Sequence, residues 1–251
     1  MKIVHIGYPK TGTKYLQDCV FPYIKGVKYM GYWASMETLR PIFEGSTPDF
    51  ISSDIKIIPN ALYSSERLVG MPMTGILNYE IAQRLRDVGF DKVIMVIRNH
   101  DTMIESLYRQ YIQQGGVQKA KDFIRDTDIF RKSYLDYDGL IEVYIKIFGE
   151  DNVLILNYED LLSFPEYVME KMRLFCGSEE IDFKCGKRNV SLSYWSIKLL
   201  RIINHFTYNH YRKSNLISNR ISTWKFRRLL GWIDPITRVL PKRKFYKSNK
   251  I

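Results

Sequence analysis

The residues with the clearest chemical potential lie within the first seventeen of the chain, MKIVHIGYPKTGTKYLQ. A proline, a cation, two hydroxyls and a glycine occupy the turn at residues 9–13, between a β-branched apolar run and a helical pattern. Backbone N–H groups at the start of a helix are unpaired and partly positive, so they stabilise an anion. Lys10 adds a full positive charge beside them. The turn therefore predicts a site for phosphate or sulfate.

This turn differs from the phosphate loop of nucleotide kinases. The Walker A pattern, G-x-x-x-x-G-K-S/T, places a lysine directly after the second glycine. Gly7 and Gly12 have the required separation, but Thr13 and Lys14 follow in the reverse order, and Lys10 lies inside the turn. A P-loop-like nucleotide kinase is thus an alternative that the loop argues against. A strand–turn–helix unit with a solvated lysine is the simpler structural alternative.

A second group of polar residues follows the apolar run at 92–97. Arg98 comes directly after this run, and Ser106 lies eight residues further on, within a helical pattern. Arginine offers a planar fork of donors and serine one hydroxyl, and both suit a phosphate group. An ion pair between Arg98 and Asp101 is the structural alternative. Because an arginine stands where a Walker B aspartate would be expected, and no zinc-ligand spacing is present, no metal is predicted.

Together these groups resemble the PAPS-dependent sulfotransferases of the bacterial and carbohydrate type, where PAPS is 3′-phosphoadenosine 5′-phosphosulfate. PKTGT followed by an aromatic residue, leucine and glutamine is similar to the 5′-phosphosulfate loop, and the spacing of Arg98 and Ser106 is similar to the 3′-phosphate site. The resemblance covers residues 1–200 and implies PAPS as co-substrate, with Lys10 stabilising the leaving phosphate. The implied binding residues are Pro9, Lys10, Thr11, Gly12, Thr13, Lys14, Tyr15, Arg98 and Ser106, with Lys187 and Arg188 from a basic loop.

The resemblance also implies a general base, since the acceptor hydroxyl must lose its proton as its bond to sulfur forms. Family members use a histidine or a glutamate. Glu66 follows the apolar run at 61–65, and Ser-Ser-Glu there resembles the bacterial and glycan-type enzymes, so we expect Glu66 to be the base. An ion pair with Arg67 is the alternative for this residue. His100 is the second candidate for the base, whereas His5, inside the first apolar run, is expected to be a core residue.

Apolar runs that predict strands alternate with helical patterns along the chain. This order predicts an α/β fold, a P-loop-NTPase-like parallel sheet of about five strands flanked by helices, with the site at the carboxyl ends of the strands. We expect the sequence YEDL at 158–161 to cap a helix, and residues 33–60 to form loops and short helices around the acceptor pocket. Strands are predicted at 2–7, 27–32, 61–65, 92–98 and 152–158, and helices at 13–24, 75–88, 101–114, 134–148 and 165–176.

The positive charge is concentrated near the C-terminus. Residues 187–251 contain 16 basic and 1 acidic residue, whereas residues 1–186 contain 22 basic and 26 acidic residues. We therefore divide the chain into a sulfotransferase-like α/β domain, residues 1–200, and a basic, aromatic, helical C-terminal extension, residues 201–251, packed on or next to it. Two apolar helical stripes are predicted within residues 187–251, and we expect the first to pack on the protein. They are Trp195, Leu199, Ile202, Ile203 and Phe206, and Phe226, Leu229, Leu230 and Ile233.

The basic extension and the cysteines bear on partners and location. An anionic membrane surface or an anionic or lipid-linked glycan acceptor suits the extension best, and nucleic acid least, since no nucleic-acid-binding motif is present. We expect the acceptor to be a hydroxyl on a sugar or glycolipid. Cys19, Cys176 and Cys185 indicate free thiols in a reducing compartment, and no signal peptide or membrane span is predicted. A cytoplasmic enzyme, peripheral at the inner membrane surface, is expected; a catalytically silent polyanion- or membrane-binding protein is the non-enzymatic alternative.

Overall fold

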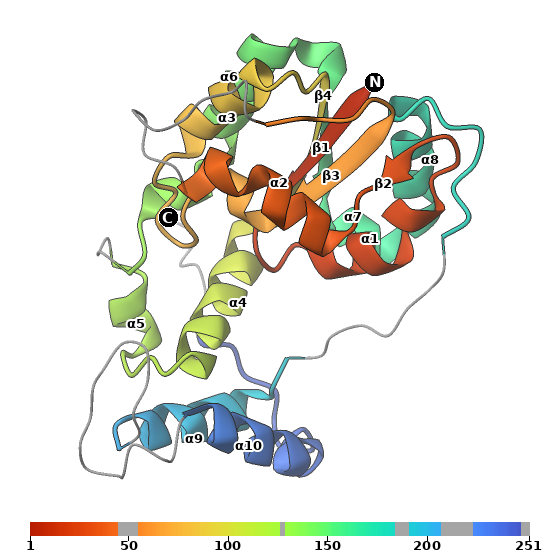
Figure 1. The fold of residues 1–251 in the computed structure, drawn as a ribbon. Coiled ribbons are helices and arrows are strands. Elements are labelled where there is room, and N and C mark those ends of the chain that lie inside the picture. The colour runs from red at the N-terminus through yellow and green to blue at the C-terminus, as the bar shows by residue number, and fades with distance from the viewer. Residues whose placement is uncertain (45–54, 126–128, 184–190, 207–222, 247–251) are drawn as a thin grey trace. The chain divides into compact units, whose positions relative to one another are not determined.

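Five parallel strands form the centre of the fold in the computed structural model (Figure 1). They follow the order β2-β3-β1-β4-β5, and this confirms the predicted parallel sheet. The structure describes residues 1–44, 55–125, 129–183, 191–206 and 223–246. The strands are β1 (Lys2–Gly7), β2 (Lys28–Tyr29), β3 (Ala61–Ser65), β4 (Lys92–Ile97) and β5 (Val153–Asn157).

The chain divides into two compact units. The first comprises Met1–Asn99 and Arg131–Arg188 and contains the whole sheet, and the second comprises His100–Phe130 and Asn189–Ile251. The expected division of the chain at residue 200 stays a prediction.

Helices cover both faces of the sheet in the first unit (Figure 1). On one face, apolar residues of α1 and α8 join Ile3, Leu62 and Ile94 in one buried cluster. On the other, α3 contacts α2 and α6, while α2 contacts β3 and α6 contacts β4 and β5. The helices of this unit are α1 (Thr13–Cys19), α2 (Tyr32–Glu44), α3 (Asn78–Asp87), α6 (Tyr137–Phe148), α7 (Tyr158–Ser163) and α8 (Pro165–Phe175), with 3-10 turns η1 (Phe21–Tyr23), η4 (Glu66–Val69), η5 (Lys132–Leu135) and η6 (Glu150–Asn152).

The helix α2 lies where the sequence predicts loops and short helices. It runs for 13 residues with Pro41 inside it. Leu39 and Ile42 are fully buried, and the buried Ser35 hydroxyl accepts a hydrogen bond of 3.2 Å from the backbone of Ser64 in β3. The prediction for this stretch was therefore wrong, because an internal proline and a buried serine obscure the helical pattern. Residues 45–54 lie outside the described residues.

The second unit is helical and has an aromatic core. Its helices are α4 (His100–Gln113), α5 (Ala120–Phe123), α9 (Tyr194–Asn204) and α10 (Thr223–Thr237). Tyr111 stacks on Phe123 with ring centroids 5.0 Å apart, and Phe123 lies 5.3 Å from Phe130. The buried Asn204 amide of α9 donates to the carbonyls of Ile112 and Gly116, at 2.7 and 2.8 Å. Hydrogen bonds to backbone thus join α9 to the end of α4.

The apolar stripe predicted for α9 is on the outside. Three of its members are exposed, at 42, 48 and 48 %: Leu199, Ile202 and Phe206. The expected packing of this stripe is therefore wrong. The buried side of α9 includes the polar Ser196 and Asn204, which can be buried because their hydrogen bonds are made within the unit.

The second predicted stripe lies on α10 and divides between two environments. Leu230 is buried, whereas Leu229 is 60 % exposed. For Phe226 and Ile233 of this stripe, the structure describes the backbone alone. Across the described ranges, no helix combines the length and the apolar character needed to cross a bilayer. Cys19 and Cys176 are free thiols, and Cys185 lies outside the described residues.

Candidate phosphate-binding and catalytic site

The turn after β1 has the conformation of a tight loop. The backbone N–H and the hydroxyl of Thr11 both donate to the carbonyl of Tyr8, at 3.3 and 2.5 Å. Lys10 and Gly12 have φ angles of 72° and 84°. Left-handed backbone is unfavourable for lysine and easy for glycine, so the loop imposes strain on Lys10. The side chain of Lys10 is exposed, on a loop that leads directly into α1.

Thr13 presents a buried hydroxyl at this loop. Its side chain is 5 % exposed, and its Oγ1 makes no hydrogen bond to any described residue. A Cβ atom on Gly7 would lie 2.9 Å from this oxygen and 2.8 Å from the His5 ring, so only glycine fits there. A buried hydroxyl without a protein partner at a cationic loop is suited to donate to a bound anion.

His5 lies in β1, two residues before Gly7, and its ring is hydrogen-bonded inside the fold. Its Nδ1 lies 2.8 Å from the Ser64 hydroxyl, which also accepts from Gln17 Nε2 at 3.0 Å. Complete burial lowers the pKa of His5 to about 3, so the ring is neutral at physiological pH. The expectation that His5 is a core residue is confirmed.

Arg98 connects the end of β4 to the loop after β1. Its Nη1 donates a hydrogen bond of 2.7 Å to the carbonyl of Lys10. The guanidinium also lies over the ring of Tyr158, at 4.5 Å from the ring centroid. Desolvation lowers the pKa of Arg98 from its ordinary value, while Tyr158 and Glu159 oppose this effect. The structure therefore brings Arg98 and Lys10 together in the first unit.

Several tyrosines around the loop were not among the predicted site residues. Tyr8 is buried between Tyr134 and Tyr137, with ring centroids 5.1 and 4.9 Å away. Burial raises the pKa of each of these three phenols, so they keep their protons. A Cβ atom on Gly12 would lie 3.3 Å from the Tyr158 ring. Tyr158 begins the YEDL sequence, which was expected only to cap a helix.

Glu66 lies directly after β3, where η4 begins. Desolvation raises the pKa of its carboxyl group, and the positive charges of Lys10 and Arg67 oppose that rise. The residue still reaches solvent. Arg67 forms an ion pair with Glu44 of α2, at 3.6 Å. A carboxylate with a raised pKa within the electrostatic reach of Lys10 is suited to accept a proton.

The remaining predicted residues are distributed over both units. Pro9 is buried, Lys14 is exposed and Tyr15 is half-buried, all at the loop or on α1. His100 and Ser106 lie on α4 of the second unit, where His100 is exposed and Ser106 is half-buried. Lys187 and Arg188 lie outside the described residues. Their roles stay predictions. Within the described part of the chain, no cluster of three or more His, Cys, Asp or Glu residues is placed to hold a metal ion.

Comparisons with known proteins identify the family. The sulfotransferase domain family matches residues 1–229. A sulfotransferase from Alicyclobacillus acidocaldarius shares 14 % identity and a TM-score of 0.56, over 81 % of this chain and 95 % of that chain. A mouse sulfotransferase complexed with PAP shares 15 % identity and a TM-score of 0.46, over 90 % of this chain and 74 % of that chain. The sulfotransferase domain from the curacin biosynthetic pathway shares 13 % identity and a TM-score of 0.43, over 71 % of this chain and 74 % of that chain.

No curated protein sequence matches the chain. The Alicyclobacillus structure supports the fold, and the family match covers most of the residues. The predicted enzyme class, a sulfotransferase, is confirmed. The chain belongs to the sulfotransferase domain family.

Proposed function

We propose that the protein transfers the sulfuryl group of PAPS to a hydroxyl acceptor, with the loop after β1 as the centre of the site. One observation carries this proposal within the family that the chain belongs to. The buried Thr13 hydroxyl, with no hydrogen bond to a described residue, lies at the same loop as the exposed cation of Lys10. Both groups suit a bound phosphate or sulfate.

The residues present fit PAPS as a co-substrate, which supplies a sulfuryl group activated by attachment to a 5′-phosphate. We assign the 5′-phosphosulfate to the loop and the start of α1, and the 3′-phosphate to the residue after β4, to α4 and to a basic loop. The first set is Pro9, Lys10, Thr11, Gly12, Thr13, Lys14 and Tyr15, and the second is Arg98, Ser106, Lys187 and Arg188.

Lys10 has the charge-stabilising role in this proposal. Negative charge develops on the bridging oxygen as the bond to sulfur breaks, so a fixed cation there stabilises the transition state more than the ground state. The left-handed φ of Lys10 and the hydrogen bond from Arg98 to its carbonyl define the backbone position from which the lysine side chain extends. A preorganised cation needs no reorganisation during the reaction.

Glu66 is the proposed general base, with His100 as the second candidate. A base must be ionised before the reaction and basic enough to accept the acceptor's proton. Desolvation raises the pKa of Glu66, and the nearby charge of Lys10 limits this rise. The carboxylate is therefore more basic than that of an ordinary glutamate.

The acceptor proposed is a hydroxyl group on a sugar or glycolipid, and the protein is proposed to act in the cytoplasm. Peripheral contact with an anionic membrane belongs to the same proposal, because it would bring the enzyme to a lipid-linked acceptor. The composition of residues 187–251, with 16 basic residues and 1 acidic residue, supports this contact.

Transfer of labelled sulfate tests the proposed function. Wild-type protein is incubated with PAPS carrying sulfur-35 and a panel of monosaccharides, oligosaccharides and glycolipids. We expect label in one acceptor class, and a loss of about 10²-fold or more in kcat for Lys10→Ala. Lys14→Ala is the matched comparison, because Lys14 is an exposed lysine on the same segment and should affect KM more than kcat. Near-normal transfer by Lys10→Ala would contradict the assigned role.

A further inference from the structure

The helix α10 buries one charged residue beside an apolar one and exposes large apolar residues. Asp234 is 4 % exposed and Leu230 is 3 % exposed. Trp232 and Ile236 are 80 and 73 % exposed. A surface helix of a soluble protein normally buries its apolar side and exposes its charges. The buried Asp234 of α10 therefore requires an explanation, and its exposed apolar residues require an occupant.

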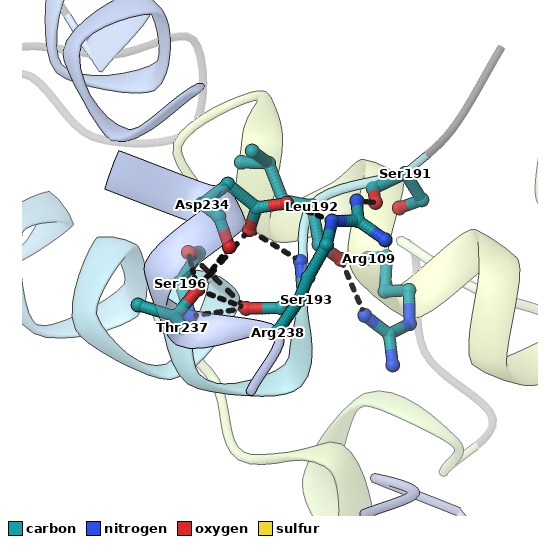
Figure 2. A network of polar contacts seen from close by, with 8 residues as sticks. All are labelled: Arg109, Ser191, Leu192, Ser193, Ser196, Asp234, Thr237 and Arg238. Carbon is teal, nitrogen blue, oxygen red and sulfur yellow. Dashed lines mark hydrogen bonds and ion pairs between the residues drawn. The ribbon is translucent and has the colours of Figure 1, made fainter. Parts of the chain in front are cut away.

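The explanation for the buried charge is a hydrogen-bond network within the second unit (Figure 2). The Asp234 carboxylate accepts from the backbone N–H of Ser193 at 2.7 Å and pairs with Arg238 at 2.7 Å. The Thr237 hydroxyl lies 2.7 Å from the Ser193 hydroxyl and 2.9 Å from that of Ser196. This network fixes the rotation of α10 about its own axis, so the exposed side is determined by specific contacts.

The exposed side forms a continuous apolar stripe. Residues three to four apart lie on the same side of a helix. Leu229, Trp232 and Ile236 follow this spacing, and Val239 continues it in the turn after the helix. Their exposed fractions are 60, 80, 73 and 87 %. We call these four residues the α10 stripe.

Positive charges flank the α10 stripe. Arg227 and Arg228 are exposed on the helix, and three consecutive basic residues are exposed after it: Lys242, Arg243 and Lys244. The one acidic residue between 223 and 246 is Asp234, which is buried and paired with Arg238. The surface contributed by this segment is therefore apolar and cationic, without exposed carboxylates.

We propose that the α10 stripe is a membrane-docking surface that inserts into the interface of an anionic bilayer. An apolar stripe with a tryptophan suits the boundary between headgroups and acyl chains, and flanking arginines and lysines suit anionic headgroups. The absence of exposed carboxylates along residues 223–246 removes repulsion from such a surface. This inference rests on the membrane contact proposed above and does not depend on sulfuryl transfer.

Co-sedimentation of the full chain with vesicles tests the inference. One set of vesicles contains phosphatidylcholine with about 30 % phosphatidylserine, and the other contains phosphatidylcholine alone. The variant combines Trp232→Ser with Ile236→Ser and leaves every flanking charge in place. Trp33→Ser is the matched control, because Trp33 of α2 is 81 % exposed and Trp232 is 80 % exposed. Circular dichroism confirms that each variant is folded.

We expect the wild-type protein and Trp33→Ser to bind the anionic vesicles equally. The double variant should lose at least about tenfold in partition coefficient, because two large apolar side chains no longer enter the interface. Unchanged binding by the double variant would overturn the inference, since charge alone would then account for it. Absence of wild-type binding to anionic vesicles would also overturn it.

Sedimentation velocity distinguishes a second copy of the chain as the occupant. A wild-type dimer that the double variant converts to monomer, without vesicle binding, would replace the membrane by a protein interface. Titration of the same samples with adenosine 3′,5′-bisphosphate separates the two proposals. Vesicle binding without nucleotide binding would reject the PAPS assignment and leave the docking surface, and the reverse result would reject only the docking surface.

Discussion

The guanidinium of Arg98 donates a hydrogen bond of 2.7 Å to the backbone carbonyl of Lys10 and so joins the end of β4 to the loop after β1. Tyr158 lies beneath the same guanidinium, 4.5 Å from ring centroid to the central carbon. A residue proposed to bind the 3′-phosphate thus also fixes the backbone of the residue proposed to stabilise the leaving group. The two subsites are therefore expected to respond together to substitution.

Substitution of Arg98 should separate these two effects. Arg98→Ala should weaken the binding of adenosine 3′,5′-bisphosphate far more than that of ADP, because only the former has the 3′-phosphate. It should weaken ADP binding slightly, because the hydrogen bond to the Lys10 carbonyl in the loop is lost. Arg98→Lys keeps the charge but not the planar fork, so it should recover only part of the affinity for the 3′-phosphorylated nucleotide. Isothermal calorimetry measures both ligands. Equal losses for the two nucleotides in Arg98→Ala would remove the 3′-phosphate assignment.

The pH dependence of the reaction should report Glu66. A base works only when ionised, so kcat/KM should fall as the pH falls through the pKa of Glu66. Because desolvation raises this pKa, the fall should begin at a higher pH than for an ordinary glutamate. Glu66→Gln should reduce kcat by about 10²-fold or more and abolish this acid limb. Glu44→Gln is the control, since Glu44 pairs with the adjacent Arg67. An unchanged rate and pH profile in Glu66→Gln would place the base elsewhere, with His100 next.

Glu66→Gln should increase the stability of the protein although it reduces its activity. A carboxyl whose pKa is raised on folding stabilises the folded state below the pKa of the unfolded chain, and this contribution is lost as the pH rises through the folded pKa. At neutral pH, Glu66→Gln should therefore increase the free energy of unfolding, measured by urea denaturation. A less stable Gln variant at neutral pH would show that the carboxylate makes a favourable contact in the folded state.

Two glycines with similar backbone angles provide a matched pair at the loop. Gly12 and Gly26 have φ angles of 84° and 79°. A Cβ atom on Gly12 would lie 3.2 Å from Leu161 and 3.3 Å from Tyr158, whereas one on Gly26 would meet nothing within 4 Å. Both alanine variants should lose about 1–2 kcal/mol of stability from left-handed backbone. Only Gly12→Ala should also lose nucleotide affinity by calorimetry, and equal nucleotide affinities in the two variants would exclude a binding role for this part of the loop.

Asp234 should stabilise the second unit in a pH-dependent way. Its burial alone would raise its pKa, but hydrogen bonds from Ser193 and Ser196 and the charge of Arg238 lower the pKa overall. Its stabilising contribution is therefore present above the pKa of the unfolded chain and is lost as the pH falls through the folded pKa. Asp234→Asn should lower the free energy of unfolding by about 1–3 kcal/mol at neutral pH, measured by thermal unfolding. The control Asp18→Asn, at an exposed position, should change the free energy of unfolding little. Equal melting curves for the two variants would contradict the role of the network.

Local patterns were sufficient to predict the sheet and the tight turn between β1 and α1. Each buried strand is a short apolar run, and a turn with Lys10 and Gly12 leads directly into a helix, so neighbouring residues contain the whole signal. The contact from Arg98 to the Lys10 carbonyl depends on β1 and β4 lying side by side, which no local pattern reveals. The aromatic contacts of Tyr158 depend in the same way on distant elements meeting at the loop.

The errors have a common physical origin in polar residues that are buried. On α9, hydrophobicity pointed to Leu199 and Ile202, yet the buried side contains Asn204, whose amide finds two backbone carbonyls. On α2, Pro41 and the buried Ser35 obscured a helix of 13 residues. Sequence periodicity assigns polar residues to the surface, and it fails where tertiary hydrogen bonds satisfy them in the interior.

Calorimetric titration of the wild-type protein in EDTA, with adenosine 3′,5′-bisphosphate, ADP and ATP in turn, tests the central claim most directly. We expect metal-free binding that strongly prefers the 3′-phosphorylated nucleotide, because Lys10 and Thr13 are proposed to bind the 5′-phosphate and Arg98 the 3′-phosphate. Equal binding of the three nucleotides, or binding that appears only with magnesium and ATP, would contradict it.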